Sequence, residues 1–141
     1  HFLWSYECNA LSHAMILKHI AQKMNKTTPT VMGFLSARVG SISDNQLGGW
    51  YSYRAAKAAL NMIIKTASIE MKRYNKQLSI IGIHPGTVDT FLSEPFQNHV
   101  PEQKLFTPEQ SVNYIFDNII DKVTVEDSGH VFAWDGEKVP S

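Results

Sequence analysis

The chain has 141 residues, of which 43% are hydrophobic and 18% are charged, a composition typical of one modest globular domain. Thirteen basic and thirteen acidic residues cancel, which argues against a nucleic-acid partner or binding to an anionic membrane surface. No apolar run approaches the ~20 residues needed to cross a bilayer. A single cysteine, Cys8, excludes an internal disulfide and fits a reducing compartment, so we expect a cytoplasmic protein in which Cys8 is a buried structural thiol.

Helical and strand patterns alternate along the sequence. In chain order, the expected elements are a helix (5–24), a strand (30–36), a Gly- and Ser-rich loop (38–50), a long helix (51–74), a strand (78–84), an irregular segment (88–103), a helix (107–122) and a strand (128–134). The strands are apolar without alternation, which indicates strands buried on both faces and paired in parallel through helical crossovers. The sequence therefore predicts an α/β layer fold.

A sheet of only three strands leaves open edges. The run over 30–36 has a fully buried composition, so we expect it to have neighbouring strands on both sides. The sequence also opens on HFLWSYECNAL, without a start signal or turn cluster before the first apolar stretch. Together these features suggest the C-terminal part of a longer chain.

Tyr53 and Lys57 are four residues apart, so on a helix they share one face. An ammonium beside a phenol favours the phenolate, and a lowered pKa would let Tyr53 pass a proton near neutral pH. The spacing alone fits an exposed helical pair equally well. The context of the pair favours a catalytic role. The pair follows a loop that leaves the carboxyl end of one parallel strand, and the segment HPGTVDT lies at the carboxyl end of the next strand. Ligands of open α/β sheets bind outside the carboxyl ends of the strands.

The stretch SARVGSISDNQLGGWYSYRAAKAALN, followed by IIGIHPGTVDT, resembles the catalytic part of the short-chain dehydrogenase/reductase (SDR) family. It most resembles the subgroup of the C-factor and sniffer-type carbonyl reductases. The resemblance implies that residues 1–141 are the C-terminal catalytic portion of one Rossmann-fold domain. Its sheet would be a doubly wound parallel sheet, here three strands with flanking helices. The family's Gly-rich TGxxxGxG turn does not occur in the sequence, so we expect the N-terminal nucleotide-binding half to be absent and cofactor binding by these residues alone to be poor.

The resemblance also implies roles for individual residues. Tyr53 would be the proton donor to the substrate carbonyl, and Lys57 would lower its pKa and bind the nicotinamide ribose. Asn9 would hold a water that links to Lys57 in a proton relay. The segment that matches the nicotinamide-binding stretch of the family contributes Pro85, Gly86, Val88 and Thr90.

The catalytic serine of the family is less simply placed. Many members have a Ser-Ser pair at the end of the strand, whereas this sequence has Ser36-Ala37. Ser41 lies twelve residues before Tyr53, close to the usual separation, so we rank Ser41 first and Ser36 second. Either hydroxyl could instead satisfy loop backbone groups.

These features predict an NAD(P)-dependent oxidoreductase of the carbonyl reductase or alcohol dehydrogenase type, acting on a small carbonyl or alcohol. The resemblance slightly favours NADP over NAD, and implies a homo-dimer or homo-tetramer of the full-length protein. The histidines form no ligand set, so no metal is expected. Two alternatives remain: a non-catalytic SDR-like binding or signalling protein, and a truncated chain that is inactive by itself.

Overall fold

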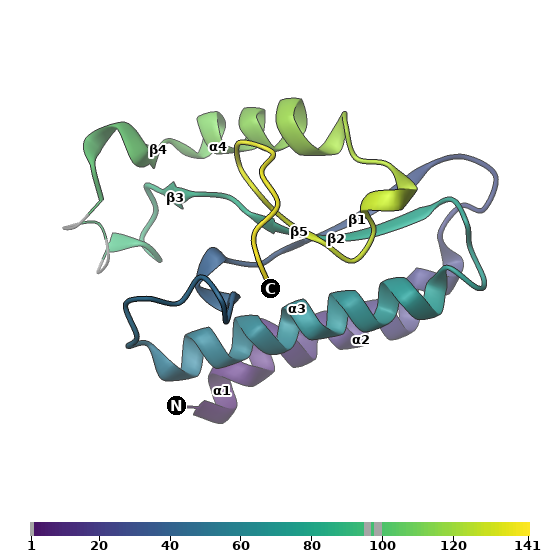
Figure 1. Ribbon diagram of the computed structural model, residues 1–141, viewed down its shortest axis with the longest axis horizontal. Coiled ribbons are helices and arrows are strands. Elements are labelled where there is room, and N and C mark those ends of the chain that lie inside the picture. Colours follow the sequence, from purple (N-terminus) through teal and green to yellow (C-terminus); the bar gives the residue numbers. More distant parts are fainter. Residues whose placement is uncertain (1, 95–96, 98–99) are drawn as a thin grey trace.

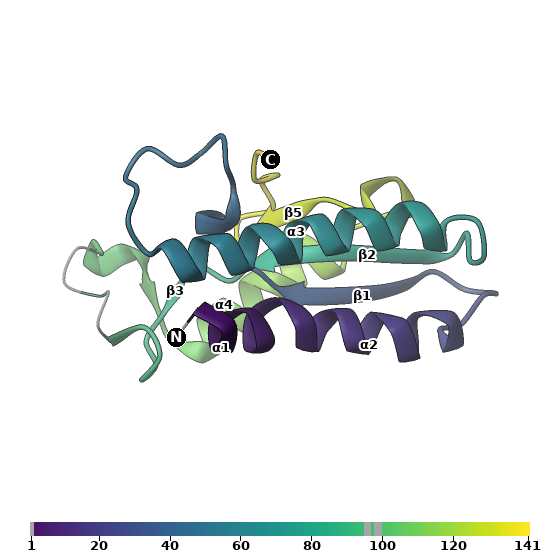
Figure 2. The same ribbon diagram turned by 90° about the horizontal axis from the view of Figure 1, so that it is seen from below.

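A parallel sheet lies between two layers of helices in the computed structural model, which describes residues 2–94, 97 and 100–141 (Figures 1 and 2). Its three strands have the order β1-β2-β5, and both pairings are parallel. The strands are β1 (Thr30–Leu35), β2 (Leu78–His84) and β5 (Val131–Ala133). The α/β class and the parallel pairing predicted from the sequence are confirmed.

Helices cover both faces of this sheet. One layer contains α1 (Phe2–Tyr6), α2 (Ser12–Ile20) and α3 (Tyr51–Met71), and the other contains α4 (Pro108–Ile115). A π-helical turn, Glu7–Leu11, joins α1 to α2, so the helix expected over 5–24 is one irregular helical run. The predicted start of α4 is confirmed, because Thr107 and Gln110 form a reciprocal capping box and Pro108 occupies the first turn.

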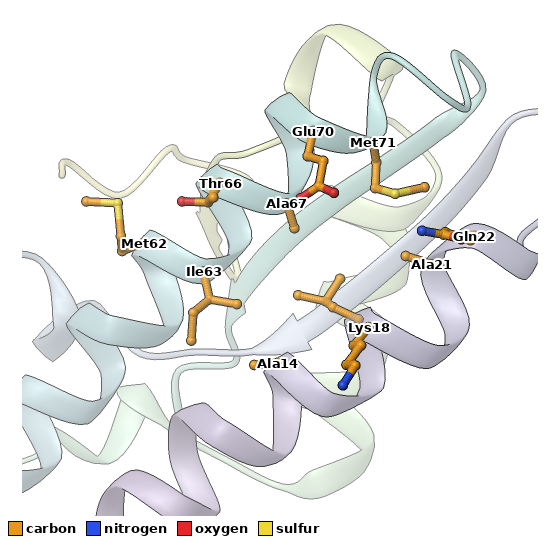
Figure 3. Close-up of a pocket in the computed structure, with 11 residues that line it drawn as sticks. Ala14, Lys18, Ala21, Gln22, Met62, Ile63, Thr66, Ala67, Glu70 and Met71 are labelled. Atoms are coloured by element: carbon orange, nitrogen blue, oxygen red, sulfur yellow. The ribbon is translucent and has the colours of Figure 1, made fainter.

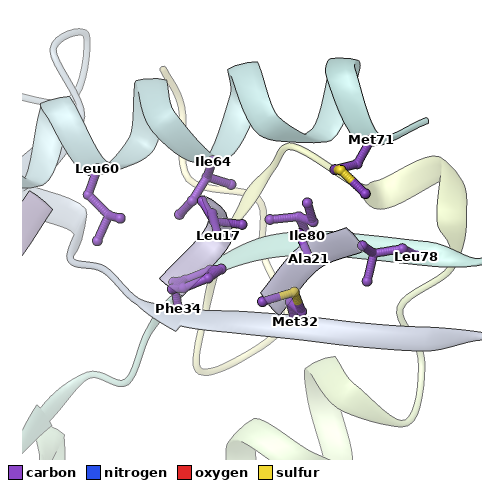
Figure 4. Close-up of a cluster of buried hydrophobic side chains, with 9 residues drawn as sticks. All are labelled: Leu17, Ala21, Met32, Phe34, Leu60, Ile64, Met71, Leu78 and Ile80. Carbon is purple, nitrogen blue, oxygen red and sulfur yellow. The ribbon is translucent and has the colours of Figure 1, made fainter. Parts of the chain in front are cut away.

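The hydrophobic core follows from the alternation of side chains along the strands. Met32 and Phe34 of β1 and Ile80 of β2 point towards α2 and α3, where they pack against Leu60 and Ile64 (Figure 4). The intervening residues of β2 pack on the opposite face with α4 and its extension; this second cluster consists of Ile81, Ile83, Ile119 and Phe132. The two clusters fix the register of the sheet.

The central strand of this sheet is β2. Among the described residues β1 pairs only with β2, and Leu35 of β1 is 57% exposed, so the second neighbour expected for β1 stays a prediction. A short pairing flanks the segment expected to be irregular: β3 (Thr87–Val88) pairs in parallel with β4 (Leu105–Phe106), and of residues 88–103 only Val88 belongs to it among those described. Such short strands have too few residues to show a period of two.

Candidate active site

The carboxyl end of β1 meets α3 at Lys57. The Lys57 side chain is buried, and its Nζ donates a hydrogen bond to the carbonyl oxygen of Leu35 at 2.8 Å. Gly40 packs directly on the Lys57 backbone, since a Cβ on Gly40 would lie 2.7 Å from the Lys57 carbonyl carbon. The Lys57 ammonium is thus anchored at the end of β1, while the Lys57 backbone packs against Gly40.

Tyr53 lies one helical turn before Lys57 and is 37% exposed. Lys57 Nζ is 5.7 Å from the centroid of the Tyr53 ring. Burial raises the pKa of Tyr53, and burial lowers the pKa of Lys57. The expectation that Lys57 lowers the pKa of Tyr53 is therefore not met in this structure, because desolvation dominates at the phenol.

Asn9 lies in the π-helical turn, which packs against α3. Its Nδ2 donates to the carbonyl oxygen of Ser5 at 3.0 Å, and Ser5 Oγ donates to the carbonyl oxygen of Ser52 at 3.4 Å. These bonds tie the Asn9 segment to the residue before Tyr53. The expectation of a buried Cys8 is wrong: Cys8 is exposed, since it points away from the buried side of the run that contains Ala10.

His13 is a neighbour of this site that sequence reasoning considered only as a metal ligand. It follows Asn9 by four residues, so both lie on one helix face. Its ring packs edge-on against Phe34, with 5.7 Å between ring centroids. Burial and the charge of Lys57 lower the pKa of His13, which places it within the electrostatic reach of the ammonium. The spacing of four residues between Asn9 and His13 is the sequence feature that could have identified His13 as a neighbour of the site.

The segment from Pro85 to Thr90 leaves the carboxyl end of β2 at the same edge of the sheet (left side of Figure 1). Ser111 Oγ donates to the carbonyl oxygen of Pro85 at 2.9 Å. Gly86 has φ +80° and lies against Phe106, whose ring a Cβ would approach to 2.6 Å. Phe106 packs in turn on Trp134, with ring centroids 4.7 Å apart. Val88 is half-buried and Thr90 is exposed, so the outer end of the segment faces solvent.

The two candidate serines lie on different sides of α3. Ser36 Oγ donates to Asn61 Oδ1 at 2.5 Å, and Asn61 is one turn beyond Lys57 on the same face. Ser41 Oγ accepts a hydrogen bond from Asp44 N at 3.1 Å. Ser41 lines a small depression with Arg54 and neighbouring residues, about 100° around the helix from the Tyr53 face. The ranking of Ser41 over Ser36 stays a prediction.

A groove of about 400 Å³ lies between α2 and α3, not at the strand ends (Figure 3). Ala14, Lys18, Met62, Thr66 and Glu70 are among the side chains that line it. Neither Tyr53 nor Lys57 lines it, so the groove is a feature separate from the candidate site. Among the described residues, no three His, Cys, Asp or Glu side chains are grouped to hold a metal ion. Over the same residues, each helix is too short or too polar to span a bilayer.

Comparisons with known proteins identify the family of this chain. Residues 2–101 match the family model for short chain dehydrogenases. The chain is 34% identical over 130 residues to 1-hydroxy-2-glutathionyl-2-methyl-3-butene dehydrogenase of Rhodococcus sp. (strain AD45), covering 92% of this chain and 54% of that protein. It is 26% identical to the C-signal protein of Myxococcus xanthus, covering 96% and 76% of the two chains.

Solved structures share the fold. Carbonyl reductase Sniffer of D. melanogaster superimposes with a TM-score of 0.82 at 24% identity, covering 99% of this chain and 57% of that one. An NADPH-bound carbonyl reductase from chicken fatty liver gives a TM-score of 0.75 at 24% identity, covering 96% and 53%. This chain spans just over half the length of most of these relatives. On the family match and the shared fold, the chain belongs to the short-chain dehydrogenase/reductase family.

Proposed function

We propose that this chain carries the catalytic centre of an NAD(P)-dependent oxidoreductase that interconverts a carbonyl compound and an alcohol. The observation that carries the proposal is the Tyr53–Lys57 pair on one face of α3. The Lys57 ammonium is anchored at the end of β1, at the same sheet edge as the segment from Pro85 to Thr90. A proton donor and a cation at the carboxyl ends of parallel strands are the groups that a carbonyl reduction needs.

Tyr53 acts in this proposal as the general acid. As the carbonyl carbon is reduced, the Tyr53 hydroxyl gives its proton to the carbonyl oxygen, and the Lys57 ammonium stabilises the phenolate that remains. The raised pKa of Tyr53 keeps the phenol protonated at neutral pH, which suits proton donation. Asn9, fastened beside Ser52, would hold the water through which the proton is replaced.

The residues present fit the nicotinamide end of a dinucleotide. Lys57 Nζ gives one hydrogen bond to Leu35, which leaves two of its three donors for ribose hydroxyls. The exposed Thr90 and the half-buried Val88 and Gly86 offer hydroxyl and backbone groups to a carboxamide. When bound, the nicotinamide supplies or accepts the hydride. NADP is favoured over NAD because carbonyl reductases of the same fold contain NADPH or NADP.

Replacing Tyr53 by Phe tests the mechanism in a chain that also carries a nucleotide-binding half. We expect turnover of an aldehyde with NADPH to fall by about 10²–10⁴-fold, because the general acid is lost. Tyr51→Phe is the matched control, since Tyr51 is exposed and has Ala55 in place of a lysine four residues on. Unchanged turnover in Tyr53→Phe would show that the proton comes from elsewhere. Absence of turnover in the unaltered protein with any carbonyl or alcohol would favour the non-catalytic alternative.

We also propose that two copies pair through the face formed by α2 and α3. Apolar side chains of α2 and α3 remain open to solvent; they include Met15, Ile16, Met62 and Ile69, each at least 45% exposed, and Met62 lines the groove. Lys18 and Glu70 border the groove on opposite helices and could form ion pairs across a two-fold axis. Sedimentation equilibrium should give a dimer mass or a multiple of it, and Met62→Glu should shift the mass to that of a monomer.

A further inference from the structure

A single peptide group at the end of β1 contacts both the next strand and the Lys57 ammonium. The carbonyl oxygen of Leu35 and the N–H of Ser36 belong to this planar trans peptide, so they point in opposite directions. The N–H donates to the carbonyl oxygen of Ile83 in β2 at 2.7 Å, and the carbonyl oxygen accepts a hydrogen bond from Lys57 Nζ at 2.8 Å. The place of the ammonium therefore depends on the orientation of this one peptide.

The side chain of Ser36 binds α3 as well. Ser36 is 4% exposed, and its Oγ donates to Asn61 Oδ1 at 2.5 Å. Asn61 follows Lys57 by four residues, so both lie on one face of α3. Two residues of that face thus bind two consecutive residues at the strand end, because Lys57 binds Leu35, the last residue of β1, and Asn61 binds Ser36, which follows it. These two contacts restrict rotation of the strand end against the helix.

The hydrogen of the Ser36 hydroxyl is used in this contact. A serine has one hydroxyl hydrogen, and Ser36 donates it to Asn61, so none is left for a substrate oxygen. Ser41 Oγ, by contrast, is the acceptor in its hydrogen bond with Asp44 N. Separating Ser36 from Asn61 would leave a buried hydroxyl without a partner, which is unfavourable. The contact therefore gives Ser36 a structural role beside the candidate site.

The Lys57 ammonium needs an acceptor at this place, because the residue is only 6% exposed and a buried charge without a hydrogen-bond partner is unfavourable. Within the described part of the chain, the oxygen that it binds is the Leu35 carbonyl. If the peptide between Leu35 and Ser36 rotated, the ammonium would lose this acceptor, and the long side chain would turn its charged end to water. The bond between Ser36 and Asn61 opposes that rotation.

We propose that Asn61 is a positioning residue for Lys57. By holding Ser36, Asn61 keeps the Leu35 carbonyl within hydrogen-bonding distance of the ammonium, and so keeps the ammonium near the Tyr53 ring. The placement of the ammonium follows from these contacts alone. Its effect on turnover rests on the proposed function, because the position of Lys57 matters to catalysis only if Tyr53 transfers a proton there.

Hydrogen exchange of the Lys57 ammonium, followed by NMR, tests this placement without reference to activity. Asn61→Leu keeps the approximate size of the side chain and removes the acceptor, so the ammonium should exchange at least about tenfold faster. Asn61→Asp retains an oxygen acceptor and should stay within about threefold of the unaltered chain. Ser36→Ala should match Asn61→Leu, and the double variant should exceed neither, because all three remove the same bond. Unchanged ammonium exchange in Asn61→Leu would overturn the positioning role.

Kinetics separate positioning from a general loss of stability. In a chain that also carries a nucleotide-binding half, Asn61→Leu should lower kcat for benzaldehyde with NADPH by about tenfold, with the KM of benzaldehyde changed by less than about threefold. Ser79→Ala is the matched control, because it removes another buried hydroxyl, which donates to the carbonyl oxygen of Thr124 at 3.0 Å, far from Lys57 along β2. An equal fall of kcat in Ser79→Ala would overturn the positioning role. If the unaltered protein reduces no aldehyde, the proposed function fails, and the ammonium exchange still decides the role of Asn61.

Discussion

His84, the last residue of β2, should make the stability of the chain depend on pH between neutrality and about pH 4. Within the described part of the chain, its Nδ1 is a buried atom without a hydrogen-bond partner. Burial, and then the nearby positive charge of Arg38, lower the pKa of His84 from 6.5 to about 4, with Asp135 opposing. Replacing His84 by Gln removes the titrating group while keeping a polar side chain.

The sign follows from comparing the folded and unfolded chains. Below pH 6.5 the unfolded chain binds a proton at His84, whereas the folded chain resists it down to about pH 4. The contribution of neutral His84 to the free energy of unfolding is therefore complete above pH 6.5 and is lost as the pH falls to about 4. The full difference is worth about 3 kcal/mol, and about 2 kcal/mol of it is lost between pH 7 and pH 5.

Urea unfolding followed by tryptophan fluorescence at pH 7 and pH 5 measures this contribution. The free energy of unfolding should fall between these two pH values by about 2 kcal/mol more in the unaltered chain than in His84→Gln. His19→Gln, a change at an exposed histidine, controls for the loss of one imidazole. An equal pH dependence in the unaltered chain and in His84→Gln would refute the reasoning that burial keeps His84 neutral.

Two further predictions concern the site. Gly40→Ala should lower the free energy of unfolding by about 1–3 kcal/mol, because the new Cβ meets the Lys57 backbone; Gly33→Ala, whose Cβ meets the flexible end of the Ile83 side chain, should cost less in the same urea titration. Ser41→Ala should reduce kcat for an aldehyde more than Ser36→Ala, by up to about 10²–10³-fold if Ser41 donates to the developing oxyanion. The opposite order would transfer the role to Ser36, which lies on the Lys57 face through Asn61.

Local patterns were sufficient where one side chain or one short period decides the structure. Thr107, Pro108 and Gln110 contain the whole capping signal of α4, and the structure shows that cap. The apolar run of β2 was placed over 78–84 because a strand buried on both faces has no polar interruption. The Tyr53–Lys57 face follows from the helical period alone, and the structure keeps both side chains on it.

Contacts between distant residues decided the rest. The direction of the Tyr53 pKa depends on burial of its ring, and Lys57 binds the carbonyl of Leu35, which lies 22 positions away. The exposure of Cys8 and the separation of Ser36 from Ser41 depend on which helix face packs on the sheet. The residues next to them in the sequence do not specify that face.

The sequence by itself therefore determined the order of the elements, the parallel α/β class and the family, since these depend on periodicity and on short motifs. Only the tertiary structure decided that β2 is the central strand, that Arg54 binds Val39 and Gly48, and that the Nδ1 atom of His84 is buried within reach of the charge of Arg38. The physical reason is that periodicity reports which faces are apolar, whereas burial, charge and hydrogen bonding at a site depend on which distant segments meet there.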